Sequence, residues 1–262
     1  MTNTLIFKPE DIERTRPSQY SLDEWNARLE LAACYQVFAR RGWAEEIFNH
    51  ITLRVPGAGR GYLINPFGLN YSEVTARNLV KIDISGHLLE DTRYTVNRAG
   101  FVIHSAIHRA REDAHCIIHT HDPYGLAVAC KEGGLAMDNF YAAFLAGKMA
   151  YHDFEGVVVN EAEQPRLVAS LGNKSCLMLR SHGVLVAEQT IPSAFYWYYV
   201  LRRACQTQVM SSAMPGANIP LTQQACETSS RDVQETDPAR DVFPKVFAGA
   251  VRQAGVTLEQ LL

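Results

Sequence analysis

The sequence predicts a mixed α/β fold, in which helices cover both faces of a largely antiparallel or mixed β-sheet. Apolar segments with strand-like alternation and segments with helical periodicity follow one another without a strict repeat, which is typical of such a layered domain. The 262 residues, 47% hydrophobic and 20% charged, are enough to bury one large core. Two smaller domains would also fit this length, but the sequence indicates no second core. We therefore expect a single domain.

The first firm element is a helix that begins at Ser21. Ser21 and Glu24 form a capping box, and apolar residues follow at helical spacing until Gly42, where the helix should end. Residues 1–20 are polar and contain two prolines, so we expect an irregular lead-in. Strand-like segments follow at residues 47–55, 62–65, 79–84 and 87–90.

Further helices and strands are expected in the rest of the chain. A helix is expected at residues 100–111, and it leads into a strand that ends in His119-Thr120-His121. Further strands are predicted at residues 156–160, 176–179 and 184–187, and further helices at residues 165–171 and from Pro192 to about Met210. The expected division is an irregular lead-in at 1–20, one domain at 21–213, and a linker with a helical tail at 214–262.

Composition limits the classes of partner. A formal net charge of −3, without a local run of Lys or Arg, is not typical of proteins that bind nucleic acid or an anionic membrane. The sequence has no stretch of about 18 apolar residues, and its N-terminus does not resemble a signal peptide. The six cysteines are scattered without a CxxC pair, as expected of reduced thiols. We therefore expect a soluble cytoplasmic protein that binds small molecules or other proteins.

Two histidines flank a threonine at the end of the apolar run Cys116-Ile117-Ile118. On a strand of period two, His119 and His121 project from one face and Thr120 from the other. Neutral imidazoles are preferred ligands of zinc, iron and nickel, so the pair could form half of a metal site that needs another ligand from elsewhere. The alternative is a pair of hydrogen-bonded histidines at a strand end.

Several segments occur in the order in which the class II aldolase/adducin family has them, and the chain resembles that family over roughly residues 25–210. The segments are Ile64-Asn65-Pro66-Phe67-Gly68-Leu69, Leu79-Val80-Lys81-Ile82-Asp83 before Gly86, Asn97 to His108 leading into the His119-Thr120-His121 strand, Tyr151-His152-Asp153-Phe154-Glu155-Gly156, and Leu179-Arg180-Ser181-His182-Gly183-Val184. The similarity is greatest to the adducin-head branch, and the sugar-phosphate aldolases are more distant.

The resemblance implies a three-layer α/β/α domain, usually assembled as a homotetramer with active sites near subunit boundaries. It also implies one divalent metal ion per chain, held by His119, His121 and, as third ligand, His182. Zinc is the expected ion, with manganese, iron, cobalt or nickel as alternatives. His182 follows a second predicted buried strand, so three imidazoles could leave one position for water or substrate.

The sequence departs from the sugar-phosphate aldolases at two places. Those enzymes have an acid/base glutamate four residues before the helix histidine that matches His104, and this chain has Gly100 there. Their phosphate-binding hydroxyl residues correspond to Arg98 and Ala99, and their Thr-Pro-Ser-Gly loop to the segment that begins at Asn65. We therefore expect an unphosphorylated substrate.

The resemblance also directs the choice of substrate-binding residues, which are Arg98, Asn65 and His104. Arg98 could meet a carboxylate through its planar guanidinium, or it could be a structural or surface arginine. His104 could instead be a core residue or a donor to the metal ligands. Two residues are candidates for catalysis: Asp122, which as a helix N-cap has a sufficient structural explanation, and Tyr141, near where the aldolases place a tyrosine that acts across the subunit boundary.

Three functions remain open at this stage. The first is a metal-dependent lyase that performs aldol-type cleavage or decarboxylation on a small unphosphorylated hydroxy- or oxo-acid. The second is a non-haem iron oxygenase that uses the same imidazoles. The third is a non-catalytic module like the adducin head, which gains weight from Gly100.

Overall fold

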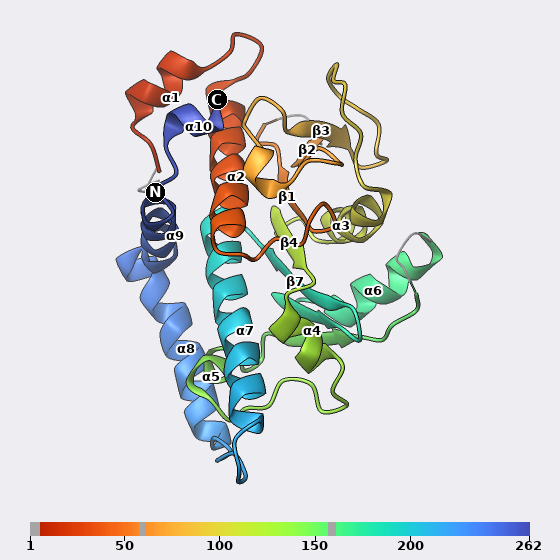
Figure 1. Cartoon of the computed structure of the whole chain (residues 1–262), viewed down its shortest axis with the longest axis vertical. Helices are drawn as coiled ribbons and strands as arrows, with labels where there is room; N and C mark the ends of the chain where they lie inside the picture. The colour runs from red at the N-terminus through yellow and green to blue at the C-terminus, as the bar shows by residue number, and fades with distance from the viewer. Residues whose placement is uncertain (1–5, 58–60, 157–160) are drawn as a thin grey trace.

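Seven strands form one mixed sheet in the order β3-β2-β1-β4-β7-β6-β5. All neighbouring strands are antiparallel except β5 and β6, which are parallel. The computed structural model describes residues 6–57, 61–156 and 161–262, and helices flank the sheet (Figure 1). The predicted fold class, a single layered α/β domain with a mixed sheet, is therefore confirmed.

The strands are β1 (His50–Arg54), β2 (Gly61–Ile64), β3 (Val80–Asp83), β4 (Cys116–Thr120), β5 (Met149–His152), β6 (Cys176–Leu179) and β7 (Gly183–Glu188). The α-helices are α1 (Pro9–Thr15), α2 (Leu22–Arg40), α3 (Arg98–Ala110), α4 (Pro123–Ala129), α5 (Phe140–Phe144), α6 (Gln164–Leu171), α7 (Ile191–Ser212), α8 (Gln223–Arg240), α9 (Val242–Gln253) and α10 (Leu258–Leu261). Two single 3-10 turns lie at Tyr71–Glu73 and Glu161–Glu163.

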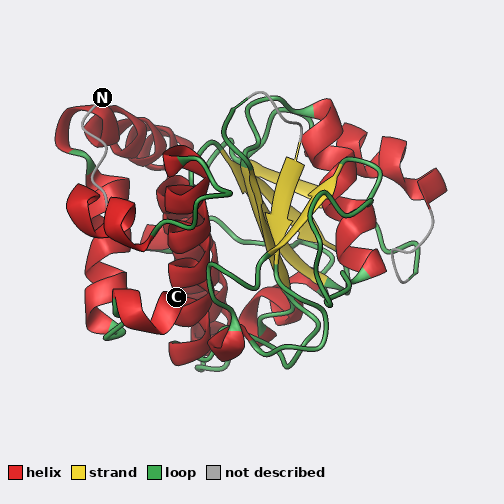
Figure 2. Cartoon of the chain, turned by 90° about the horizontal axis from the view of Figure 1, so that it is seen from above, coloured by secondary structure: helices red, strands yellow, loops and turns green. Residues whose placement is uncertain are grey.

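The alternation of β4 divides its side chains between two cores. Cys116 and Ile118 pack into the larger core with residues of α2 and α7, whereas Ile117 packs into a smaller core with residues of α3 and α6. Figure 2 shows these helix layers on opposite faces of the sheet. Because side chains alternate along a strand, His119 shares the α3 side with Ile117. Thr120 lies on the other side and donates to the Tyr198 hydroxyl at 3.1 Å.

Helix α2 begins and ends where the sequence predicts, but only half of the predicted capping box forms, because the Glu24 carboxylate binds Arg28 and Lys81. The Ser21 side chain accepts a hydrogen bond from the Glu24 backbone N–H, and Gly42, with φ of 65°, follows the last turn. A glycine accepts this left-handed conformation without the steric penalty of a side chain. The sequence also indicates correctly where α4 begins, because Asp122 is its N-cap and Pro123 its first residue.

Four expectations about secondary structure are wrong. The strand expected at residues 87–90 is reduced to an isolated bridge between Leu88 and Ile82 of β3. Pro9–Thr15 is helical within the expected irregular lead-in, and Gln223–Arg240 is helical within the expected linker. Met149–His152 forms edge strand β5, which the sequence analysis did not identify. Tertiary contacts explain both the edge strand, which pairs with β6, and α8, which packs on α5 and α9. Most of the strand predicted at residues 156–160 lies outside the described residues.

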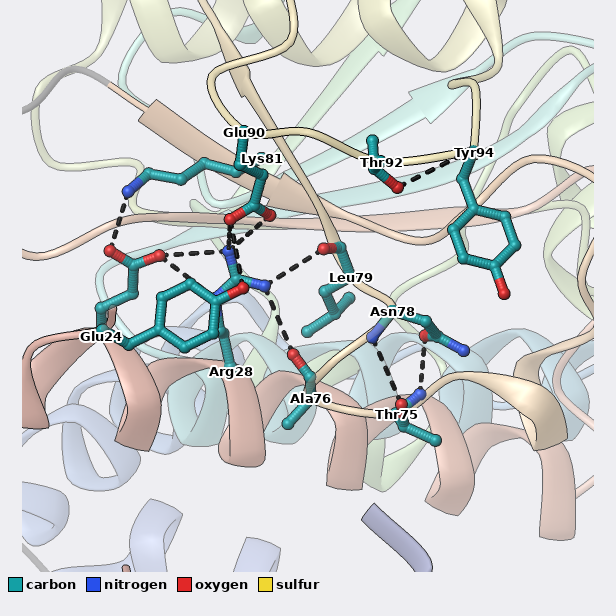
Figure 3. Close-up of polar contacts among 11 residues, drawn as sticks. Glu24, Arg28, Thr75, Ala76, Asn78, Leu79, Lys81, Glu90, Thr92 and Tyr94 are labelled. Atoms are coloured by element: carbon teal, nitrogen blue, oxygen red, sulfur yellow. Dashed lines mark hydrogen bonds and ion pairs between the residues drawn. The ribbon is translucent and has the colours of Figure 1, made fainter. Parts of the chain in front are cut away.

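A buried arginine connects α2 to the segments on either side of β3. Arg28 is fully buried, and its guanidinium donates to the carboxylates of Glu24 at 3.1 Å and Glu90 at 2.7 and 2.8 Å. It also donates to the carbonyls of Ala76 at 3.3 Å and Leu79 at 3.1 Å (Figure 3). Removing one partner from such a buried charge cluster typically costs roughly 3–5 kcal/mol, so this contact holds the β2–β3 side of the sheet against α2.

The described helices include none that is both long enough and apolar enough to span a bilayer.

Candidate metal centre

Three histidines meet where the central strand β4 ends and its neighbour β7 begins. His119 is on β4, His121 follows the end of β4, and His182 lies in the turn between β6 and β7. Since β4 and β7 pair antiparallel, with Thr120 opposite Val184, the end of β4 lies beside the start of β7 (Figure 1). The candidate ligand nitrogens of the three imidazoles all lie within 4.8 Å of one another. We call this group the histidine trio.

Gly183 explains why His182 can approach the end of β4. A Cβ atom at position 183 would collide with the Thr120 carbonyl oxygen, so any side chain there would push β7 away from β4. The residue before His182, Ser181, has a left-handed backbone with φ of 55°, which is uncommon for a residue other than glycine. The tight turn and the glycine together bring His182 to the trio.

Hydrogen bonds leave the Nε2 atoms of two trio members free of protons. His119 Nδ1 lies 3.0 Å from the Val184 carbonyl oxygen, and His121 Nδ1 lies 2.5 Å from Glu45 Oε2. Carbonyls and carboxylates only accept hydrogen bonds, so both Nδ1 atoms carry the proton and both Nε2 atoms present a lone pair. This is the form in which imidazole binds a metal ion.

Burial keeps His119 and His182 neutral near pH 7. Desolvation and neighbouring imidazoles lower the pKa of His119 well below its usual range, and the same causes lower the pKa of His182 to about 4. His119 is buried, whereas His121 and His182 are half-buried. Three imidazole nitrogens with one side toward solvent fit a divalent ion that keeps a position for water or substrate.

A second group of histidines lies where α3 packs on the sheet, and it consists of His104 and His108 of α3, which contact Thr52 of β1. His108 Nδ1 donates to the Ala114 carbonyl at 2.8 Å, so its Nε2 accepts from the Thr52 hydroxyl at 2.8 Å. The Thr52 oxygen must then accept from His104 Nδ1 at 2.7 Å. This series of hydrogen bonds leaves His104 Nε2 without a proton, as an acceptor. His104 Nε2 has no hydrogen-bond partner among the described residues.

His50 lies between His104 and the trio. Its ring centroid is 4.5 Å from that of His104 and 5.2 Å from that of His119, which it faces across the β1–β4 pairing. Its Nδ1 lies 3.3 Å from the Phe48 carbonyl, and its buried Nε2 has no partner within the described chain. Burial lowers the pKa of His50 to about 3, so this imidazole is also neutral.

The His50 ring takes the space next to Gly100. A Cβ atom at position 100 would lie 2.8 Å from Cγ, Cδ2 and Nε2 of His50, closer than real side chains approach. Gly100 does not have a left-handed backbone. The need for glycine at position 100 therefore comes from the neighbouring imidazole and not from the backbone.

The remaining predicted site residues have structural partners. Asp122 Oδ2 accepts from the backbone N–H groups of Tyr124 and Gly125, and its Oδ1 accepts from Arg202 Nε at 2.7 Å. Asn65 is buried, and its Oδ1 accepts from the Tyr35 hydroxyl at 3.0 Å. These contacts explain both side chains without catalysis or substrate binding, so those roles stay predictions.

Tyr141 and Arg98 also stay predictions. Tyr141 is on α5, which packs against α7 and α8. Its hydroxyl has a lowered pKa, mainly because of a hydrogen bond with Arg203 and secondly because of one with Tyr199. Arg98 is the first residue of α3, but its side chain lies outside what the structure describes.

Two residues beside the trio, Glu45 and His50, were not predicted from the sequence. Glu45 is 76 residues away from His121 in the chain, so no local pattern joins the two. For His50 a partial signal existed, because alternation along its strand places it on the same side as Thr52, and the Thr52 hydroxyl contacts both helix histidines in the structure.

Comparison with known proteins identifies the family of the chain. The sequence model of the class II aldolase and adducin N-terminal domain matches residues 29–209. The chain is 42% identical over 208 residues to a putative aldolase class 2 protein from Caulobacter vibrioides, covering 79% of this chain and 81% of that protein. It is 40% identical over 219 residues to alpha-adducin from Rattus norvegicus, covering 82% of this chain but 30% of that protein.

Two solved structures share the fold. An aldolase II superfamily protein from Pseudomonas syringae superposes with a TM-score of 0.83 at 36% identity, covering 90% of this chain and 94% of that one. An L-fuculose 1-phosphate aldolase from Glaciozyma antarctica superposes with a TM-score of 0.77 at 26% identity, covering 92% of this chain and 96% of that one.

Proposed function

This chain belongs to the class II aldolase and adducin family, and we propose that it is a divalent-metal-dependent lyase acting on a small unphosphorylated hydroxy- or oxo-acid. The reaction would be an aldol-type cleavage or a decarboxylation. The observation that carries the proposal is the histidine trio, whose ligand nitrogens lie within 4.8 Å of one another at a partly exposed site where the central strand β4 ends and β7 begins. Zinc is the ion that we expect there, because tetrahedral sites with three imidazoles and one open position suit it.

The ion, when bound, would polarise a carbonyl or enolate oxygen and stabilise the negative charge that develops on cleavage. His119, His121 and His182 would hold it, and the Val184 carbonyl and Glu45 keep two of these rings in the ligating tautomer. The buried face of the site, formed by His50 and His104, contributes neutral acceptors and no charge.

The glycine at position 100 favours decarboxylation over aldol-type cleavage. An aldol-type cleavage needs a base to remove a proton from a hydroxyl group, and the family glutamate that would do this is replaced by Gly100. Loss of carbon dioxide needs no base at the start. Arg98 is the proposed partner for a substrate carboxylate, since guanidinium binds carboxylate in a two-donor geometry.

Metal analysis of the protein, purified without added metal, separates the three candidate functions. About one equivalent of zinc or manganese would support the lyase, and iron would support the oxygenase. Empty sites would support a non-catalytic module like the adducin head, which the alpha-adducin relative makes a real alternative. A screen of hydroxy- and oxo-acids with the metal-loaded protein then tests the substrate class, and failure of every acid would count against it.

We expect that Gly100→Glu will not produce cleavage of sugar phosphates. General acid/base groups contribute roughly 10²- to 10⁴-fold to rates, but a side chain at position 100 would collide with His50 at 2.8 Å. The phosphate-binding hydroxyls are also missing from the Asn97–Gly100 segment, and remote binding of this kind supports kcat as well as KM. The measurement is turnover of fuculose, rhamnulose and ribulose phosphates by the wild type and the variant.

The double variant Gly100→Glu/His50→Ala is the matched control, because it removes the collision between position 100 and His50 but does not restore the phosphate-binding hydroxyl groups. It should remain inactive on the same phosphates. Turnover by wild type or Gly100→Glu within about tenfold of a typical kcat on the order of 10 s⁻¹ would show that the chain is a sugar-phosphate aldolase.

We also propose that the protein assembles as a homotetramer. The aromatic residues of α7 do not provide an obvious subunit contact, because Phe195, Trp197 and Tyr198 are buried in the core of this chain. The support now comes from family membership and from exposed apolar side chains such as Met214 at 68% and Ile219 at 83%. Light scattering at micromolar concentration should give the tetramer mass, and a monomer mass would reject the assembly.

A further inference from the structure

Glu45 contacts the trio from a part of the chain that no sequence pattern connects with it. The residue lies between α2 and β1, and its Oε2 is 2.5 Å from His121 Nδ1. The Glu45 side chain is 50% exposed and that of His121 is 23% exposed. The contact therefore lies at the solvent side of the site, and His50 and His104 lie at its buried side.

The local structure holds this carboxylate in place. Asn49 Nδ2 donates to the same oxygen, Oε2, at 3.3 Å, and the Phe48 N–H donates to the Glu45 carbonyl at 3.0 Å. Glu46, the next residue, has a left-handed backbone with φ of 43°, an uncommon conformation for a non-glycine residue. The chain thus turns sharply just after Glu45, and buried Trp43 anchors the segment before it.

The carboxylate decides which nitrogen of His121 carries the proton. Because a carboxylate accepts and cannot donate when ionised, its contact places the proton on Nδ1 and the lone pair on Nε2. That Nε2 lies 3.1 Å from Nε2 of His182. Without Glu45, the His121 ring could move its proton to Nε2 and donate to His182, and this nitrogen would then be unable to bind an ion.

We propose that Glu45 is the positioning residue of the metal centre, which fixes the tautomer and ring orientation of His121 and adds one negative charge beside the bound ion. This inference rests on the proposed metal site. Carboxylates that accept from ligating histidines in this way orient the ring and raise its basicity. The charge partly balances a divalent ion that three neutral imidazoles would otherwise leave uncompensated.

The first test compares zinc affinity, measured by competition with a chromophoric chelator, in three variants. Glu45→Ala should weaken zinc binding by about 10- to 100-fold. Glu45→Gln should weaken it less, because the amide oxygen still accepts from Nδ1 although the charge is lost. Glu46→Gln, which removes the charge of the adjacent exposed residue, should stay within about twofold of wild type. Equal affinities of Glu45→Ala and wild type would overturn the proposal.

The second test does not need a metal. Nitrogen-15 chemical shifts of the imidazoles in the chelator-treated protein report which His121 nitrogen is protonated. Wild type and Glu45→Gln should show the proton on Nδ1, and Glu45→Ala should shift toward the Nε2 form. An unchanged tautomer in Glu45→Ala would overturn the inference even if zinc binds. If wild type binds no zinc, the proposed function fails, and the chemical shifts alone decide the role of Glu45.

Discussion

Replacing His119 and His121 together by alanine is expected to reduce the bound divalent metal from about one ion per chain to nearly none. The two side chains supply two of the three ligand nitrogens that lie within 4.8 Å of one another, and His182 alone cannot hold an ion against solvent. The measurement is the metal content of each purified protein after dialysis in the presence of excess zinc, by elemental analysis.

Two controls make this result specific. His115→Ala removes an exposed histidine from the residue just before β4 and should leave the metal content unchanged. Circular dichroism should show that the double variant is folded, because His119 is buried and its loss leaves a cavity. A folded double variant that keeps its metal would reject the trio as the binding site.

The metal-free protein is expected to lose stability steeply as the pH falls below about 6. Four buried imidazoles have strongly lowered pKa values through desolvation: about 3 for His50 and His108, and well below the usual range for His104 and His119. In the unfolded chain each would titrate near pH 6.5. Between that pH and the folded values the unfolded state binds more protons, so acid favours unfolding.

Each such group lowers the free energy of unfolding by up to about 1.4 kcal/mol per pH unit in this window. Glu30 acts in the opposite direction, because burial raises its pKa to about 7, and it offsets about one of the four. The net loss at pH 5 is several kcal/mol, a large part of the roughly 5–15 kcal/mol that stabilises an ordinary domain. Urea unfolding at pH 7.5, 6 and 5 measures it.

The slope of stability against pH, and not the stability itself, is the decisive quantity. His108→Phe should reduce this slope by about the contribution of one buried histidine, even if the variant is less stable at every pH. His87→Gln, at a side chain that is 79% exposed, should leave the slope unchanged. Equal unfolding free energies of the metal-free wild type at pH 7.5 and pH 5 would contradict the prediction.

These two results are linked by the state of the imidazoles. Burial that keeps His119 neutral makes it available to an ion near pH 7 without first losing a proton. The same burial makes the folded protein sensitive to acid when no ion is bound. We therefore expect zinc to move the acid transition to lower pH, because an ion that binds the native state alone stabilises it.

The sequence by itself determined the features that depend on near neighbours in the chain. The N-cap at Ser21, the N-cap at Asp122 with its following proline, and the alternation of His119, Thr120 and His121 all depend on residues within a few positions. Resemblance to the family added His182, and with it the composition of the trio. Propensity could not identify β5 or α8, because neighbouring strands and helices stabilise them.

Only the tertiary structure decided which distant side chains share a space. Glu45 meets His121 because the loop after α2 passes over the end of β4, and His50 meets Gly100 because β1 packs beneath α3. Both contacts depend on strand register and on the turns of connecting loops, which are set by packing over the whole domain. For this reason the sequence could show that a glutamate is missing at position 100, and the structure was needed to show that an imidazole fills the space.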